Sequence, residues 1–224
     1  MESTNTILNR IFSKKMVLGL INEKSNSVYN AVVWKYLQGV ESQDNRAVMQ
    51  NIYQVINASY RNEYFYKNTL LNKLLLGRHR LNTTTALSEV AVNRSKADFV
   101  LINGRAVVYE IKTELDTLDR LCTQVFDYYK AFKSVCVVTS ESNYERTLKK
   151  LAGDTRVGIY VLTRNQTISH KRDPVDDGSK LEHRAWLKFC ESMSLKIFCW
   201  STMIGFRRSN RPNTTRSASG GSTI

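Results

Sequence analysis

The stretch that decides the fold is KADFVLINGRAVVYEIK, which spans residues 96–112. It contains two runs rich in apolar and β-branched residues, 96–102 and 105–112, on either side of Asn103-Gly104. That dipeptide is a strong hairpin signal, because both central residues of a type I′ turn need positive φ. We therefore expect two antiparallel neighbouring strands joined by a tight turn.

Charged side chains gather at one end of this hairpin. Asp98 lies in its first strand, and Glu110 and Lys112 end its second strand. Residues two apart in a strand share a face, so Glu110 and Lys112 project together, and a tight turn brings Asp98 to the same end. Two carboxylates beside a lysine suit Mg²⁺ binding and chemistry on a phosphate. The alternative for such a patch is a solvated set of salt bridges that stabilises little.

Around the hairpin, helical and strand patterns alternate. A helix is expected over 57–76, and another over 118–132 with Asp116 as its cap. The other expected strands are 83–92, 134–139 and 157–162, the other expected helices lie in 1–40 (including 28–37), 143–151 and 180–193, and 164–180 is expected to be a loop. The order of helix, three-strand meander, helix and strand predicts a mixed α/β fold with extra helices at both ends.

The chain then divides into four parts. A helical extension covers residues 1–56, an α/β core covers 57–163, and a loop with a C-terminal helix packed on the core covers 164–204. Residues 205–224 carry four arginines and no acidic residue among Ser, Thr, Asn and Gly. That composition is typical of a flexible basic tail.

The charge balance indicates the class of partner. The 224 residues include 33 Lys and Arg against 20 Asp and Glu, a net charge of +13. This excess favours nucleic acid first and an anionic membrane surface second. No apolar run reaches the roughly 18 residues of a membrane-spanning helix, and no signal-peptide block is present. We therefore expect a soluble cytoplasmic protein that does not bind membranes.

A family resemblance rests on the residues of the hairpin and of the helix after it. Asp98, then Glu110-Ile111-Lys112, then Gln124 and Tyr128 one helical turn apart, resemble the PD-(D/E)XK nuclease superfamily. The run 109–124 is similar to a small bacterial and phage family of uncharacterised nuclease-like proteins. The resemblance covers about residues 60–163, and it departs from the pattern in having Ala97 rather than Pro before Asp98. It implies a restriction-endonuclease-like core.

The resemblance also implies an activity. The expected protein is an Mg²⁺-dependent nuclease that hydrolyses phosphodiester bonds, with DNA the favoured substrate and Mn²⁺ able to replace Mg²⁺. Asp98 and Glu110 would be metal ligands together with the Ile111 carbonyl. Lys112 would be the catalytic lysine, which orients or deprotonates the attacking water or stabilises the pentavalent phosphorus. Gln124 would lie near the metal-bound water or the nucleic-acid backbone.

The superfamily often has one more acidic ligand, and two residues compete for that place. Glu89 lies in the expected first strand, where an acid among apolar residues needs a partner or a metal. Glu63 lies on the preceding helix, where several relatives place theirs. We favour Glu89. The expected nucleic-acid contacts are Arg94, Lys96, Arg120 and Tyr128.

Two further functions stay open. The fold could bind nucleic acid without cutting it. It could also belong to a regulatory protein of a phage or mobile element that binds a protein partner through its N-terminal helices. Nucleases of this size often dimerise to cut both strands, so a homodimer is an alternative to a monomer.

Overall fold

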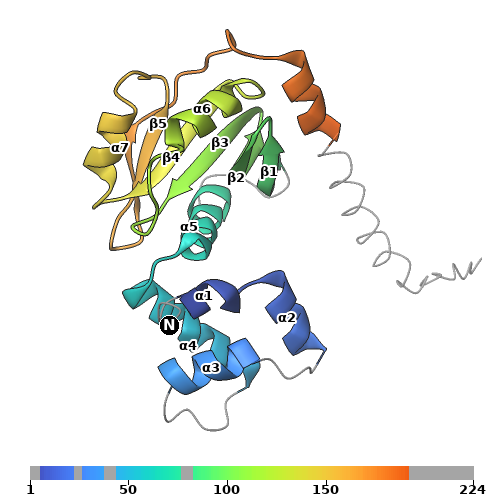
Figure 1. The fold of residues 1–224 in the computed structure, drawn as a ribbon, viewed down its shortest axis with the longest axis vertical. Coiled ribbons are helices and arrows are strands. Elements are labelled where there is room, and N and C mark those ends of the chain that lie inside the picture. Colours follow the sequence, from blue (N-terminus) through green and yellow to red (C-terminus); the bar gives the residue numbers. More distant parts are fainter. Residues whose placement is uncertain (1–5, 23–26, 38–43, 77–82, 192–224) are drawn as a thin grey trace, which may run out of the picture.

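The computed structural model describes residues 6–22, 27–37, 44–76 and 83–191. It is a mixed α/β structure built on a six-stranded sheet, in which the strands follow one another in chain order (Figure 1). The strands are β1 (Thr85–Val92), β2 (Ser95–Asn103), β3 (Arg105–Lys112), β4 (Ser134–Ser140), β5 (Gly158–Leu162) and β6 (Ile168–Arg172). Each of the five expected strands is therefore confirmed.

The strand directions explain the helices between them. β1, β2 and β3 form an antiparallel meander, whereas β4 runs parallel to β3 and β5 runs parallel to β4. Parallel neighbours need a crossover connection, usually a helix. The two crossovers contain α6 (Leu121–Tyr129) and α7 (Tyr144–Lys150).

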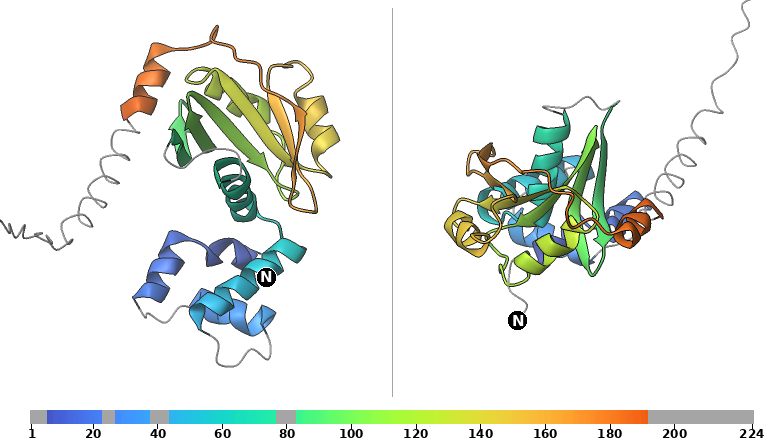
Figure 2. Two further views of the ribbon diagram at one scale, coloured as in Figure 1. Left: turned by 180° about the vertical axis from the view of Figure 1, so that it is seen from behind. Right: turned by 90° about the horizontal axis from the view of Figure 1, so that it is seen from above.

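The N-terminal part of the described chain is helical. Its helices are α1 (Thr6–Ile11), α2 (Lys14–Ile21), α3 (Ser27–Tyr36), α4 (Asn45–Ser59) and α5 (Glu63–Leu70), and α5 continues into the π-helical η1 (Leu71–Leu76). α1 to α4 cluster beside one end of α5, away from most of the sheet (Figures 1 and 2). Residues 183–191 form a further helix. No helix in these described ranges combines the length and hydrophobicity that a membrane crossing requires.

Two hydrophobic cores cover the two faces of the sheet. On one face, Phe65 and Tyr66 of α5 join Tyr109 of β3 in a cluster that extends into α1, α3 and α4; we call it the α5-side core. On the other face, residues of α6 pack with Val108 and Val137 in the α6-side core. β4 and β5 are buried along their whole length, as expected for central parallel strands covered on both faces.

One expected loop contains a strand. β6 lies within 164–180 and pairs antiparallel with β5. Its sequence, ISHKR, has no apolar alternation, and each of its residues is partly or fully exposed. An edge strand with a single neighbour needs little burial, so hydrophobic patterning did not indicate it.

Several expected boundaries were wrong. The helix predicted over 57–76 is divided, because Asn62 accepts a hydrogen bond from the Phe65 N–H at 3.1 Å and starts α5 as a separate helix. The boundary at residue 57 accordingly falls inside α4. α6 begins at Leu121 rather than residue 118, and Asp116 does not cap it.

The predicted helix cap and the predicted hairpin turn also differ in detail. Asp116 instead closes the turn after β3, since its carboxylate accepts hydrogen bonds from the N–H and hydroxyl of Thr113 at 2.8 and 2.7 Å. In the β2–β3 hairpin only Gly104 has positive φ, +69°, and Asn103 pairs with Arg105. The hairpin is therefore confirmed, but its turn is not type I′. The expected tail, 205–224, lies outside the described residues.

Candidate active site

The candidate site begins where β2 and β3 diverge. Their ladder of paired residues ends at Phe99 and Tyr109. One step beyond it, the Asp98 carboxylate accepts a hydrogen bond from the Ile111 backbone N–H at 2.8 Å. The side chain thus replaces the backbone acceptor that a continued strand would supply. This bond fixes one carboxylate at the opening between the strands.

Near Asp98, the alternation of side chains between the two faces of the sheet is interrupted in both β1 and β2. In a regular strand, residues three apart point to opposite faces. Leu87 and Val90, however, both pack in the α6-side core, as do Ala97 and Val100. The residue at the change in β1 is Glu89, with φ of +56°.

The two face changes lie opposite each other. Glu89 and Asp98 sit between the paired positions Ser88–Phe99 and Val90–Ala97, so the register continues across them. The distortion frees both acidic side chains from the cores on either side. It costs free energy, because the left-handed region disfavours residues with a Cβ.

Three carboxylates converge beside α5. Oxygens of Glu63, Glu89 and Asp98 all lie within 4.8 Å of one another, and we call these residues the acidic cluster. The Lys67 ammonium lies 2.5 Å from a Glu63 carboxylate oxygen and also bonds Glu89. Lys96 makes an ion pair with Glu89 as well. Two ammonium groups therefore offset much of the negative charge of the cluster.

Asp98 is the most perturbed acid of this cluster. Burial raises the pKa of Asp98 to about 7, and the neighbouring Glu110 carboxylate adds to the increase. The hydrogen bond from the Ile111 N–H acts in the opposite direction. Near neutral pH this carboxyl group is thus poised between its charged and neutral forms.

A buried network lies on the α6 side of β3. Glu110 is 1% exposed, and one of its oxygens accepts from Lys112 at 2.7 Å and from Gln124 at 2.5 Å. Lys112 also donates to the Gln124 carbonyl at 2.9 Å. The other Glu110 oxygen lies 2.5 Å from the Tyr128 hydroxyl, which is 2.9 Å from the Lys96 carbonyl. The network holds Lys112 in a defined position, as a buried ammonium requires.

The structure groups the predicted site residues in two sets that meet at Asp98. Glu63 and Glu89, the competing candidates, both belong to the acidic cluster. Glu110 does not, because its two oxygens point toward Lys112 and α6. Ile111 meets Asp98 through its N–H rather than through its carbonyl. Sequence reasoning missed Lys67, although its position four residues after Glu63 on one helix indicated an ion pair.

The four residues expected to contact nucleic acid differ in their exposure. Arg94 and Arg120 are exposed, at the β1–β2 turn and at the start of α6. Lys96 is exposed but pairs with Glu89. The prediction for Tyr128 was wrong: its side chain is fully buried, and burial together with Glu110 raises its pKa. Its hydroxyl therefore positions Glu110 instead of contacting a ligand.

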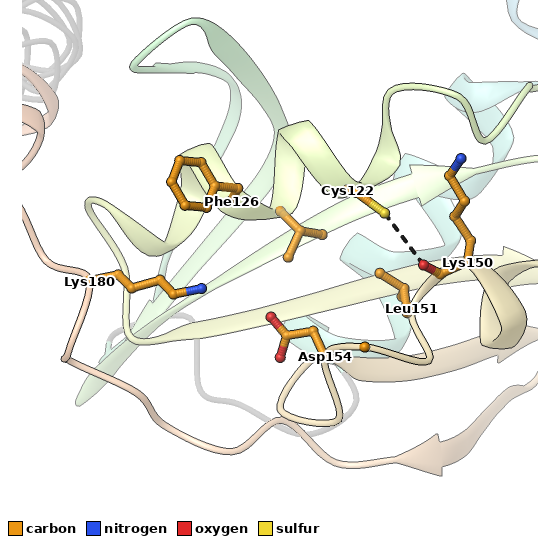
Figure 3. A pocket seen from close by; sticks show the side chains of 8 residues that line it. Cys122, Phe126, Lys150, Leu151, Asp154 and Lys180 are labelled. Carbon is orange, nitrogen blue, oxygen red and sulfur yellow. Dashed lines mark hydrogen bonds between the residues drawn. The ribbon is translucent and has the colours of Figure 1, made fainter.

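A separate hollow lies on the outer side of α6. Figure 3 shows Cys122, Phe126 and Leu151 around it, with Lys150, Asp154 and Lys180 at its rim, and its volume is about 240 Å³. The Cys122 thiol lies 3.4 Å from the Lys150 carbonyl. None of the candidate site residues lines this hollow.

Comparison with known proteins identifies the family. The sequence model of the family described as bacteriophage P4 protein cII matches residues 57–216. This chain belongs to that family. The match covers α5, the whole sheet and every candidate site residue, so the site lies within the part that defines the bacteriophage P4 protein cII family. No curated protein and no solved structure matches the chain.

Proposed function

We propose that this chain is a metal-dependent nuclease that hydrolyses phosphodiester bonds of nucleic acid, with DNA favoured. The observation that carries the proposal is the convergence of Glu63, Glu89 and Asp98 next to the buried Lys112–Glu110 pair. The succession of α5, the β1–β3 meander, α6 and β4 supports a restriction-endonuclease-like core. A cytoplasmic location and a phage or mobile-element origin accompany this proposal, and the family description supports a phage origin.

The donor set fits a hard divalent cation. The three carboxylates of the acidic cluster offer oxygen ligands within 4.8 Å of one another, which suits Mg²⁺, with Mn²⁺ as a substitute. A cation held there would lower the pKa of a bound water and offset charge on a phosphate oxygen. Lys67 and Lys96 would exchange their ion pairs with Glu89 for other partners when the carboxylates take up a cation.

The chain's own residues have distinct tasks in this proposal. Lys112 presents a fixed positive charge at the end of β3, where it would stabilise negative oxygens on the reacting phosphorus. Glu110 and Gln124 position that ammonium through hydrogen bonds of 2.7 and 2.9 Å. Arg94 and Arg120, both exposed, would hold backbone phosphates beside the site.

The test is a cleavage assay with matched variants. Purified protein with Mg²⁺ or Mn²⁺ should cut at least one of plasmid, linear duplex, single-stranded DNA, branched DNA and RNA, and EDTA should stop it. Asp98→Ala and Lys112→Ala should abolish cleavage while circular dichroism shows a retained fold. Glu145→Ala removes an exposed carboxylate from α7 and should cut normally. Equal cleavage by all these variants would show that the site is elsewhere.

A second function is favoured by the same geometry. Both Glu110 oxygens are occupied by protein donors, and two lysines offset much of the negative charge of the acidic cluster. A protein of this kind would bind nucleic acid through its basic surface without cutting it. Salt-sensitive binding with no metal-dependent cleavage on any substrate would support this alternative over the nuclease.

A regulatory role would use the N-terminal helices. Ile21 of α2 and Trp34 of α3 are exposed, with relative exposures of 69% and 76%. A protein partner that binds these helices would be lost on Ile21→Ser or Trp34→Ser, whereas nucleic-acid binding or cleavage would persist.

A further inference from the structure

A polar cavity separate from the acidic cluster lies near the start of α5. Its volume is about 550 Å³. It is lined by the end of α4, the α4–α5 link, the loop after β3 and the β5–β6 turn, through Asn57, Ala58, Arg61, Glu114, Arg164 and Gln166. None of these residues belongs to the acidic cluster or to the buried network, so the cavity is distinct from the candidate active site.

Arg61 is fixed in this cavity but has unused donors. Its Nη2 donates to the Thr163 carbonyl at 2.8 Å, and its guanidinium carbon lies 4.8 Å from the centre of the Phe65 ring. Its Nη1 is 4.0 Å from a Glu114 oxygen, which is too long for a hydrogen bond. Its Nε has no hydrogen-bond partner among the described residues. The side chain is thus held in place while most of its N–H groups lack an acceptor.

The β5–β6 turn supplies the opposite wall and is closed by its own hydrogen bonds. Thr163 donates its N–H to the Thr167 carbonyl at 2.9 Å, and their hydroxyls lie 2.7 Å apart. Gln166 has φ of +59° and donates its N–H to the Thr163 carbonyl at 3.0 Å. The Arg164 N–H donates to Glu141 at 3.0 Å, but its guanidinium has no partner in the described chain. The turn therefore presents a free guanidinium and an amide to the cavity.

The charges that line the cavity indicate which class of ligand it would bind. Arg61 and Arg164 outweigh Glu114, whose carboxylate also accepts from the Tyr66 hydroxyl at 3.1 Å. Two guanidinium groups exclude a cation, and the polar lining does not suit an apolar ligand. Guanidinium groups match the oxygens of a phosphate in a bidentate geometry, and the side-chain amides of Asn57 and Gln166 add further donors.

We propose that this cavity binds a phosphate group. The phosphate could belong to a nucleic-acid strand, at its end or within its backbone, or to a small free ligand. Glu114 follows Lys112 by two residues, so the cavity adjoins the candidate active site along the chain. The proposal does not depend on cleavage, because it uses none of the residues assigned to that activity.

The test measures binding to the full chain by calorimetry in EDTA. The probes are inorganic phosphate, a thymidine dinucleotide, and the same dinucleotide with a 5′-phosphate. Arg164→Ala should weaken phosphate binding about tenfold, and Arg164→Lys less, because a lysine keeps the charge but loses the bidentate geometry. Arg184→Ala removes the same charge from the exposed face of helix 183–191 and should change nothing.

The probes separate the sources of the phosphate. Stronger binding of the phosphorylated dinucleotide indicates a strand end, equal binding indicates an internal phosphodiester, and binding of inorganic phosphate alone indicates a small free ligand. As a second variant, Gln166→Gly keeps the left-handed backbone and removes the side chain with its amide, and it should also weaken binding.

Two results would overturn the proposal: no binding of any probe, or equal loss in Arg164→Ala and Arg184→Ala. The nuclease proposal can fail separately. Asp98→Ala should bind phosphate as wild type does, whether or not the wild-type protein cuts nucleic acid.

Discussion

The carboxylate of Asp98, one residue beyond the last pair of the β2–β3 ladder, accepts the backbone N–H of Ile111 at 2.8 Å. A side-chain carboxylate therefore replaces a backbone carbonyl as the hydrogen-bond acceptor at this point of the sheet. The same carboxylate also lies within 4.8 Å of oxygens from Glu63 and Glu89. Asp98 is thus the residue through which the sheet, the acidic cluster and the Glu110 network influence one another.

Asp98→Asn should stabilise the metal-free protein more at pH 8 than at pH 5. Burial raises the pKa of the Asp98 carboxyl from its ordinary value of 3.8 to about 7 in the folded protein. Between these values the unfolded chain ionises while the folded chain stays protonated, so wild-type stability falls as pH rises toward 7. Asn does not ionise, and its carbonyl can still accept from Ile111. The gain at pH 8 should exceed that at pH 5 by about 2.5 kcal/mol.

Urea unfolding of both proteins at the two pH values measures this difference. Asp173→Asn, an exposed acid after β6, serves as the control and should show no such pH dependence. An equal effect of Asp98→Asn at pH 5 and pH 8 would mean that the Asp98 carboxyl is not perturbed.

Two adjacent tyrosines should respond differently to loss of the hydroxyl. Tyr128 bonds Glu110, whereas the buried Tyr129 hydroxyl has no hydrogen-bond partner in the described chain. Tyr128→Phe should destabilise the protein by about 1–3 kcal/mol, because a buried carboxylate loses a donor. Tyr129→Phe should be neutral or stabilising, because it removes an unsatisfied polar atom. Denaturant unfolding measures both, and a larger loss for Tyr129→Phe would contradict the network.

Glu89→Gly should be more stable than Glu89→Ala. Both substitutions remove the carboxylate, but only glycine adopts the φ of +56° at this position without a steric penalty. The difference should be about 1 kcal/mol in free energy of unfolding. The neighbouring Ser88, outside the left-handed region, is the control, and there the alanine variant should be the more stable of the two. If alanine is also preferred at position 89, the backbone there is not left-handed.

Thiol reagents should modify Cys122 well before Cys136. Cys122 is exposed at the hollow beside α6 (Figure 3), whereas Cys136 is buried in β4. Burial also raises the pKa of Cys136 to about 12, so little thiolate forms there at neutral pH. Peptide mass spectrometry after brief labelling at pH 7.5 should find the label on Cys122, and on Cys136 only after denaturation. Early labelling of Cys136 would contradict its burial.

The sequence predicted features that depend on neighbours along the chain. The hairpin of β2 and β3 followed from two apolar runs and a Gly104 turn, and its pairing placed Asp98 beside Glu110. The meeting of Glu63 with Glu89 could not be predicted, because it depends on how α5 packs across the sheet. The burial of Tyr128 was missed because its spacing of one helical turn from Gln124 is the same for a buried tyrosine and for one that contacts a ligand at the surface. β6 was missed because an exposed edge strand leaves no apolar pattern.

The position of α5 has a mechanical consequence. Lys67 of this helix bonds both Glu63 and Glu89, and the neighbouring Tyr66 donates to Glu114 at the wall of the arginine-lined cavity. A displacement of α5 relative to the sheet would therefore change both sets of contacts. A ligand that displaced α5 from either site would then change the affinity at the other site, and by reciprocity the two effects would be equal in free energy. Two ligands that never touch would in that case be coupled through one short helix.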